Sequence, residues 1–233
     1  MIRNRKILCI STAAFVAVEI LMGILLQTAG GRGKAEFSFL SVILACAFCF
    51  IFIEKSAAYL LTQTALIFTV CADYFLVWCD PQVKLTAMIF FSAVQLAYFG
   101  RLWVEDEKGK RRLWHMGVRA GLSVGAVVLT LAVLGSAADA VAVVSMFYYA
   151  NLITNAVFAF LNYKKNWLMG AGLVLFIFCD TVIGLSLLDG YIAMSPDAFI
   201  YKIIHPGFDL AWAFYLPSQI ILAVSLLPAR LKK

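Results

Sequence analysis

The chain has 233 residues, of which 64% are hydrophobic and only 14% are charged, and its mean hydropathy is +0.93. Soluble domains are about half apolar and about a quarter charged, so this composition argues against a water-soluble fold. The net charge of +6 does not indicate nucleic-acid binding, because the cations lie between apolar runs, where they act as topology signals. We therefore expect a single integral membrane domain over residues 1–233.

Apolar runs broken by charge, glycine or proline follow one another along the whole chain. We expect transmembrane helices near residues 7–27, 37–53, 57–78, 84–103, 116–135, 138–161, 167–188 and 207–227. Each run has roughly the 17 to 25 residues that a hydrocarbon core about 30 Å thick requires. Because a helix satisfies its own backbone polar groups in lipid, the predicted fold class is all-α: a polytopic membrane helix bundle of about eight transmembrane helices.

The distribution of cations predicts the orientation of this bundle. Alternate connections hold all but four of the 19 lysines and arginines, the four being Arg32, Lys34, Lys84 and Lys202. Cytoplasmic connections are the ones that carry excess lysine and arginine. We therefore expect a cell-membrane protein with both termini in the cytoplasm, in contact with membrane lipid; the oligomeric state is left open.

Two segments of the second half resemble segments of the first. Leu66 to Asp73 (LIFTVCAD) in the third span is similar to Leu173 to Asp180 (LVLFIFCD) in the seventh. Phe90 to Gln95 (FFSAVQ) is similar to Phe214 to Gln219 (FYLPSQ) one span later. These pairs suggest an internal repeat of residues 1–110 and 111–233, that is, two four-helix halves in the same orientation; chance similarity between apolar segments is the alternative.

Asp73 and Asp180 are the clearest ionisable residues inside the predicted spans. A charged side chain in hydrocarbon is costly, so such residues usually face the interior of a bundle and mark function. Both spans run in the same direction and both residues lie roughly two turns from the outer end, so we expect them at similar depth. Low dielectric and mutual repulsion then favour one protonated and one ionised carboxyl, an acid/base pair. Hydrogen bonding between helices is the competing interpretation.

Polar side chains on neighbouring spans are expected near the same depth. These candidate substrate-binding residues are Gln95, Tyr98, Tyr148, Asn151, Asn155, Tyr215 and Gln219. Each of them can instead serve only to join helices.

Other motifs favour packing over chemistry. Gly121-Leu-Ser-Val-Gly125 matches the GxSxG nucleophile pattern, but it continues a ridge of glycines from Gly117 that suits close helix contact. His115 and His205 fall in predicted loops, away from Ser123. The cysteines lie in apolar runs without a metal-ligand cluster, so no metal and no cofactor is expected.

At these residues the chain resembles the YhhN-like lysoplasmalogenases, multi-pass membrane proteins of similar length. The resemblance is carried by Leu66 to Asp73, by Phe91-x3-Gln95-x2-Tyr98, by Gly170-x5-Phe176 up to Asp180, and by Tyr215-x3-Gln219. Where the family commonly has Gly-Asp and Ser-Asp, this chain has Ala72-Asp73 and Cys179-Asp180. It therefore resembles a divergent member.

The resemblance implies that Asp73 and Asp180 are catalytic and that the reaction is hydrolysis of the vinyl ether bond of a lysoplasmalogen-type lysophospholipid. A carboxylic acid can protonate the enol ether while a carboxylate stabilises the cation that forms. Two alternatives stay open. One is a small-solute or lipid transporter, which also uses repeated halves and polar residues near the midplane. The other is a structural membrane protein in which both aspartates only join helices.

Overall fold

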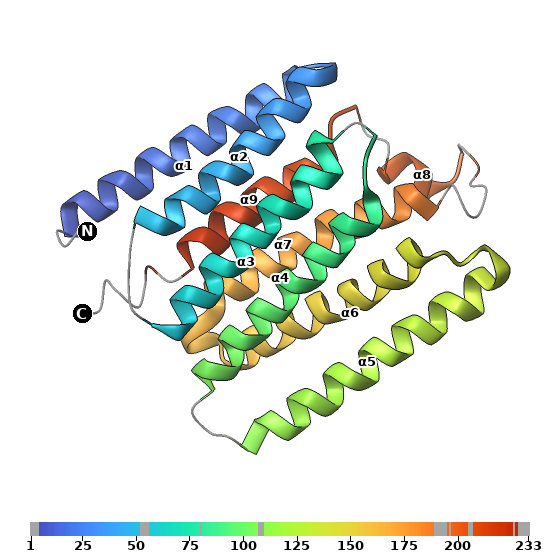
Figure 1. Cartoon of the computed structure of the whole chain (residues 1–233). Helices are drawn as coiled ribbons and strands as arrows, with labels where there is room; N and C mark the ends of the chain where they lie inside the picture. Colours follow the sequence, from blue (N-terminus) through green and yellow to red (C-terminus); the bar gives the residue numbers. More distant parts are fainter. Residues whose placement is uncertain are drawn as a thin grey trace.

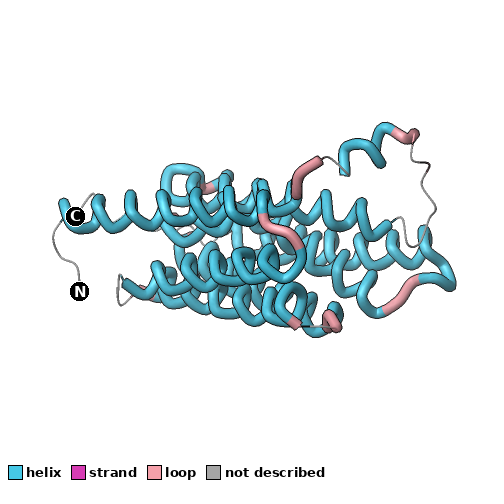
Figure 2. The backbone as a smooth tube through the Cα atoms, turned by 90° about the horizontal axis from the view of Figure 1, so that it is seen from above, coloured by secondary structure: helices cyan, strands magenta, loops and turns pink. Residues whose placement is uncertain are grey.

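A computed structural model describes residues 5–51, 56–79, 81–106, 110–188, 195, 197–204, 207–225 and 227. The helices are α1 (Arg5–Thr28), α2 (Gly31–Ile51), α3 (Ala57–Asp73), η1 (Tyr74–Trp78), α4 (Lys84–Glu105), α5 (Lys110–Leu134), η2 (Gly135–Ala137), α6 (Ala140–Leu161), α7 (Tyr163–Leu188), α8 (Phe199–Ile204) and α9 (Leu210–Val224). The described residues contain no strand (Figure 2). The predicted all-α class is therefore confirmed.

Seven of the described helices are long and apolar enough to cross a membrane, which makes the chain a multi-pass membrane protein. The eighth predicted span corresponds to α9, which has 15 described residues. At 1.5 Å per residue α9 is about 22 Å long, shorter than a hydrocarbon core of about 30 Å. It nevertheless lies inside the bundle, between α3 and α7 on one side and α2 on the other (Figure 1).

The long helices run side by side, with α1 and α5 on opposite flanks of the bundle (Figure 1). The beginning of α1 and the end of α9 lie at the same end of the bundle. We call this the terminal end, and the other end, where α3 and α7 finish and where α2, α4, α6 and α9 begin, the distal end. The short helix α8 lies at the distal end, where it contacts α7 (Figures 1 and 2).

Helix neighbours follow the same order in the two halves of the chain. Helix α3 packs on α4 as α7 packs on α9, and α1 packs on α2 as α5 packs on α6. Between the halves, α4 contacts α6 while α9 contacts α2. This order is compatible with two four-helix halves in one orientation, and the internal duplication itself stays a prediction.

Helices α7 and α9 approach closely because Gly172 has no side chain. A Cβ atom at Gly172 would lie 2.8 Å from Cγ of Leu222 and 3.3 Å from the backbone oxygen of Ser218. Asp180 lies two turns further along α7, and Tyr215 lies one turn before Ser218 on α9. The glycine therefore helps to bring two candidate site residues together.

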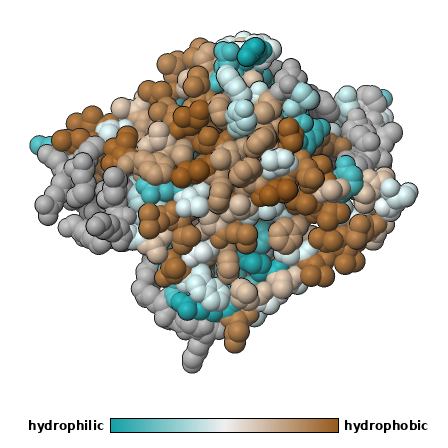
Figure 3. Space-filling model, viewed as in Figure 1, coloured by the Kyte–Doolittle hydropathy of each residue, from teal (hydrophilic) through white to brown (hydrophobic). Residues whose placement is uncertain are grey.

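The flanking helices present apolar side chains to the outside, as expected for a surface in lipid (Figure 3). On α5 the ridge of Gly117, Gly121 and Gly125 also faces outward, and apart from the adjoining parts of α5 itself no described residue lies within 4 Å of a Cβ built at any of them. The close helix contact predicted for this ridge is therefore not formed within the described part of the chain. Ser123 faces inward and accepts a hydrogen bond from Asn151 at 3.1 Å, which agrees with a packing role.

One loop expectation was wrong. Helix α5 begins at Lys110, six residues before the predicted span, so His115 lies in a helix and is buried against the ring of Phe158. His205 lies outside the described residues.

Candidate functional site

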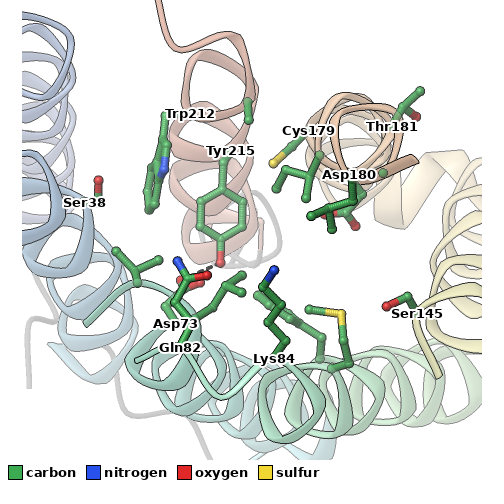
Figure 4. A pocket seen from close by; sticks show the side chains of 18 of the residues that line it. Ser38, Asp73, Gln82, Lys84, Ser145, Cys179, Asp180, Thr181, Trp212 and Tyr215 are labelled. Atoms are coloured by element: carbon green, nitrogen blue, oxygen red, sulfur yellow. Dashed lines mark hydrogen bonds between the residues drawn. The ribbon is translucent and has the colours of Figure 1, made fainter. Parts of the chain in front are cut away.

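A cavity of about 710 Å³ opens at the distal end of the bundle and reaches both intramembrane aspartates (Figure 4). Its mouth includes the exposed residues Gly31, Gln82 and Lys84, and its inner wall includes Asp73, which is 1% exposed. Helices α2, α3, α4, α6, α7 and α9 all contribute to its lining. The volume lies in the range of sites for small molecules, roughly 300 to 1,000 Å³.

Asp73 is positioned where the geometry of its helix changes. Helix α3 ends at Asp73 and continues as a π-helical turn, in which the amide of Cys79 donates to the carbonyl oxygen of Tyr74 at 2.9 Å. Such turns occur frequently at functional sites, because they rotate the side chains that follow. Here Leu76 and Val77 of the turn line the cavity next to Asp73.

Both aspartates accept a hydrogen bond from a tyrosine on another helix. The hydroxyl of Tyr215 on α9 donates to Oδ2 of Asp73 at 2.6 Å, and the hydroxyl of Tyr148 on α6 donates to Oδ2 of Asp180. Asp180 is half-buried on α7 and lines the same cavity as Asp73. Among the described residues neither Oδ1 has a hydrogen-bond partner. Each carboxyl thus keeps one oxygen for a ligand or for water.

Phe176 links the two tyrosine–aspartate pairs. Its ring centroid lies 5.3 Å from that of Tyr215 and 6.4 Å from that of Tyr148, and it also contacts Phe91 at 5.9 Å. Phe176 is 1% exposed. Packed aromatic rings of this kind restrict rotamers, so one buried side chain fixes the spacing of both hydroxyl donors.

Apolar side chains form most of the remaining wall. They are Leu76, Val77, Met88, Phe91, Val141, Met146, Ile183, Leu185 and Leu187. The polar groups gather around the aspartates and at the mouth, where Gln82, Lys84 and Ser145 are found (Figure 4). An apolar wall with a few convergent polar groups suits an amphiphile.

The mouth carries two lysines, and they differ in their partners. Lys34 on α2 forms an ion pair with Asp209, and Asp209 also caps α9 by accepting from the amide of Trp212 at 3.1 Å. Lys84 forms no ion pair with any described carboxylate. Asp209 therefore both caps α9 and holds the charge of Lys34.

Of the seven predicted binding residues, Tyr148 and Tyr215 line the cavity and the other five do not. Asn151 and Asn155 instead hold Arg119 of α5, whose guanidinium donates to each amide oxygen at 2.5 Å. Asn155 in turn donates to Oε1 of Gln95 at 2.9 Å. These groups form a buried network that joins α4, α5 and α6 on the terminal side of the aspartates.

Tyr98 and Gln219 are also buried away from the cavity lining. One turn beyond Tyr98, the fully buried Arg101 donates to the hydroxyl of Ser225 at 2.6 Å and that of Thr62 at 3.2 Å. Arg101 and Arg119 had been counted among the cations of the connections, but both lie inside the bundle. Their hydrogen bonds join helices, which is the structural role weighed for polar residues of membrane helices.

Lys84 and Trp212 are cavity residues that did not stand out in the sequence. Lys84 was interpreted only as a topology signal. Its spacing to Met88 and Phe91 is i, i+4 and i+7, which places all three on one helix face. Phe91 belongs to the segments that carry the family resemblance. A residue on the same helix face as Phe91 could therefore have been predicted to line the same site, and this spacing was the sequence signal for Lys84.

Within the described part of the chain, no group of three or more histidine, cysteine, aspartate or glutamate side chains is arranged to hold a metal ion. The polar groups of the cavity include the two carboxyls, the two tyrosine hydroxyls and the cations of the mouth. Such a set can donate, accept and store protons, which is sufficient for acid/base chemistry.

Comparisons with known proteins add one match. The model of the YhhN family matches residues 33–226, which is most of the chain and includes both aspartates. Neither the curated proteins nor the solved structures contain a match to this chain.

Proposed function

Because this membrane protein belongs to the YhhN family, the lysoplasmalogenase family, we propose that it hydrolyses the vinyl ether bond of lysoplasmalogen-type lysophospholipids. The products are a fatty aldehyde and a glycerophospho head group. Asp73 and Asp180 are the catalytic residues in this proposal. It requires no metal and no organic cofactor.

One observation carries the proposal: two carboxyls from different helices reach the same mostly apolar cavity, each fixed by a tyrosine hydroxyl. If the two aspartates only joined helices, both oxygens of each carboxyl would be expected to accept hydrogen bonds from neighbouring helices. Here each carboxyl retains an oxygen that has no partner among the described residues. An acid and a base on opposite sides of a substrate need that arrangement.

The reaction balances with water as the only co-substrate. The protonated carboxyl gives its proton to the β-carbon of the enol ether, and the electron pair of the C=C bond forms the new C–H bond. The ionised carboxylate stabilises the oxocarbenium ion and takes a proton from water as the water oxygen attacks the α-carbon. The C–O bond of the hemiacetal then breaks: the carboxyl that took the proton from water gives it to the glycerol oxygen, and the other carboxylate takes the hydroxyl proton as the aldehyde carbonyl forms, which restores both groups.

Tyr148 and Tyr215 are the substrate-binding residues that we retain from the sequence-based set. Each orients its carboxyl, and each hydroxyl lies beside the position of the reacting bond in this scheme. The apolar wall formed by residues such as Met88, Phe91 and Ile183 takes the hydrocarbon chain of the substrate. Exclusion of bulk water by this wall strengthens the electrostatic stabilisation of the cation.

The cation distribution leads us to propose the orientation as well. In the sequence, most of the lysines and arginines fall in or next to the alternate connections that share a side with both termini, so we place both termini in the cytoplasm of a cell-membrane protein. The cavity mouth at the distal end then faces away from the cytoplasm. A lysophospholipid of that leaflet has its head group at the same level as Lys34 and Lys84.

Incubation of the purified protein with a lysoplasmalogen tests the proposal, with the released aldehyde trapped and quantified. We expect aldehyde and the glycerophospho product in equal amounts. The saturated alkyl ether of the same head group is the matched control, because it lacks the double bond that the acid protonates. Absence of aldehyde under conditions where the protein is folded would refute the proposed activity.

A further inference from the structure

We propose that Lys84 binds the phosphate of the substrate head group and thereby sets the preference of the cavity for phosphorylated amphiphiles; this inference rests on the function proposed above. The observation behind it is a cation at the mouth of the cavity that has no charge partner among the described residues. Figure 4 shows the Lys84 side chain directed into the cavity, toward the space between Tyr215 and Asp180.

The position of Lys84 is fixed by the backbone before it. The amide of Val83 donates to the carbonyl oxygen of Phe75 in the π-helical turn at 3.0 Å, and the amide of Ala87 donates to the carbonyl oxygen of Val83 at 3.1 Å. The segment that starts α4 is thereby attached to the turn that follows Asp73. This hydrogen bond thus fixes the position of Lys84, at the mouth of the cavity, relative to that of Asp73, at its inner wall.

The local field at this point favours an anion. Lys84 is the first residue of α4, and Val83 before it supplies no side-chain cap to the amides of the first turn. These amides and the aligned peptide dipoles add partial positive charge at the helix N-terminus. The ammonium group of Lys84 and the N-terminus of α4 therefore both attract an anion to this point.

Lys34, the other cation of the mouth, is less suited to this role. It is already paired with Asp209. Asp209 in turn is held by Gln27 of α1, whose side chain both accepts from the Asp209 amide at 2.8 Å and donates to its carbonyl oxygen at 2.9 Å. A phosphate at Lys34 would have to displace an ion pair that is part of the helix connection.

A cation is needed because the inner cavity is acidic. A phosphate brought toward Asp73 and Asp180 would be repelled unless a positive group holds it at a distance. Lys84 lies at the exposed mouth, while Asp73 is buried. In a lysophospholipid the glycerol unit separates the phosphate from the ether bond. When the phosphate binds Lys84 at the mouth, the ether bond therefore reaches the carboxyls at the inner wall.

Binding measured without catalysis tests this inference first. The probes are two saturated ethers that cannot be hydrolysed, 1-O-alkyl lysophosphatidylethanolamine and the phosphate-free 1-O-alkylglycerol, with the full-length protein in nanodiscs. For Lys84→Gln we expect the Kd of the phosphorylated ether to rise about tenfold, as for loss of a charge-assisted contact, with the Kd of the neutral ether unchanged. Lys84→Arg should keep the discrimination.

Lys202→Gln is the matched control, because Lys202 is an exposed lysine on α8 that does not line the cavity. An equal effect of the two Gln variants would overturn the inference in favour of a general surface-charge effect. Equal weakening of both ethers by Lys84→Gln would also overturn it, since the phosphate would then make no difference.

Kinetics separate this inference from the proposed function. In the wild type we expect hydrolysis of both lysoplasmalogen and phosphate-free alkenylglycerol, and Lys84→Gln should raise KM for the former alone while leaving kcat unchanged. If the wild type hydrolyses neither, the proposed function fails, and the binding measurement still decides the role of Lys84. If it hydrolyses both with KM values that Lys84→Gln does not alter, the role of Lys84 fails alone.

Discussion

Replacement of Asp73 by asparagine removes an acidic group from the cavity while keeping its size and one of its acceptors. The Tyr215 hydroxyl, which donates to Oδ2 of Asp73 at 2.6 Å, can donate to the amide oxygen instead. The bond then loses only its charge assistance, a difference of about 1 kcal/mol between charged and neutral hydrogen bonds. Because folded proteins have about 5 to 15 kcal/mol of stability, Asp73→Asn should remain folded.

The loss of activity should be much larger. General acid or base catalysis typically contributes about 10²- to 10⁴-fold, which corresponds to about 3 to 5 kcal/mol of transition-state stabilisation. Asp180→Asn should give a loss of the same order. This variant should also remain folded, because the Tyr148 hydroxyl, which donates to Oδ2 of Asp180, can donate to the amide oxygen instead. Combining the two substitutions should add little, because residues that act as a unit are not additive.

Aldehyde release by the two single variants and the double variant, measured beside thermal unfolding, is the assay. A fall in activity by at least 10²-fold with nearly unchanged unfolding is the expected outcome. Activity reduced only in proportion to the folded fraction would refute the catalytic role and return both aspartates to a packing role. Loss of substrate flux without any hydrolysis in the wild type would favour the transporter alternative instead.

Further predictions concern positioning and packing. Tyr215→Phe should lower kcat about tenfold or more with little change in KM, because it removes the group that orients Asp73; an unchanged kcat would count against that role. Gly172→Ala should destabilise the fold by about 1 to 3 kcal/mol through contact with Leu222, whereas Gly121→Ala, with open space around it, should not; equal unfolding temperatures of the two variants would contradict this. Arg119→Met should cost about 3 kcal/mol or more of stability, from two lost charge-assisted hydrogen bonds, yet leave KM of the folded fraction unchanged; a raised KM would show that its network contacts substrate.

The positions of the helices followed from the sequence because lipid imposes a length. A run of 20 apolar residues has few alternatives in a membrane. The extents of α4, of α6 and of α3 taken together with the π-helical turn η1 therefore lie within two residues of prediction at each end. The start of α5 was missed because charged residues were assumed to end the span. Lys110 to His115 continue the helix beyond the apolar run, and a helix needs no lipid around it to extend.

Contacts inside the bundle were predicted only in part. Asp73 and Asp180 were expected to meet because they occupy matching depths on helices of the same direction, and depth can be counted along a helix. The direction in which a side chain points around the axis cannot be counted in this way when a helix is apolar on all faces. Asn155 was therefore expected in the cavity but accepts a hydrogen bond from Arg119, and Gln95 accepts one from Asn155.

Deuterium incorporation during hydrolysis is the most direct test of acid/base chemistry by the two aspartates. The purified protein is incubated with lysoplasmalogen in D₂O, and the aldehyde is reduced at once to the alcohol and examined by mass spectrometry. The proposed mechanism predicts a single deuterium on the carbon next to the former carbonyl, together with loss of this product in Asp73→Asn and Asp180→Asn. An aldehyde released without deuterium at that carbon, or at the same rate by both variants, would contradict it.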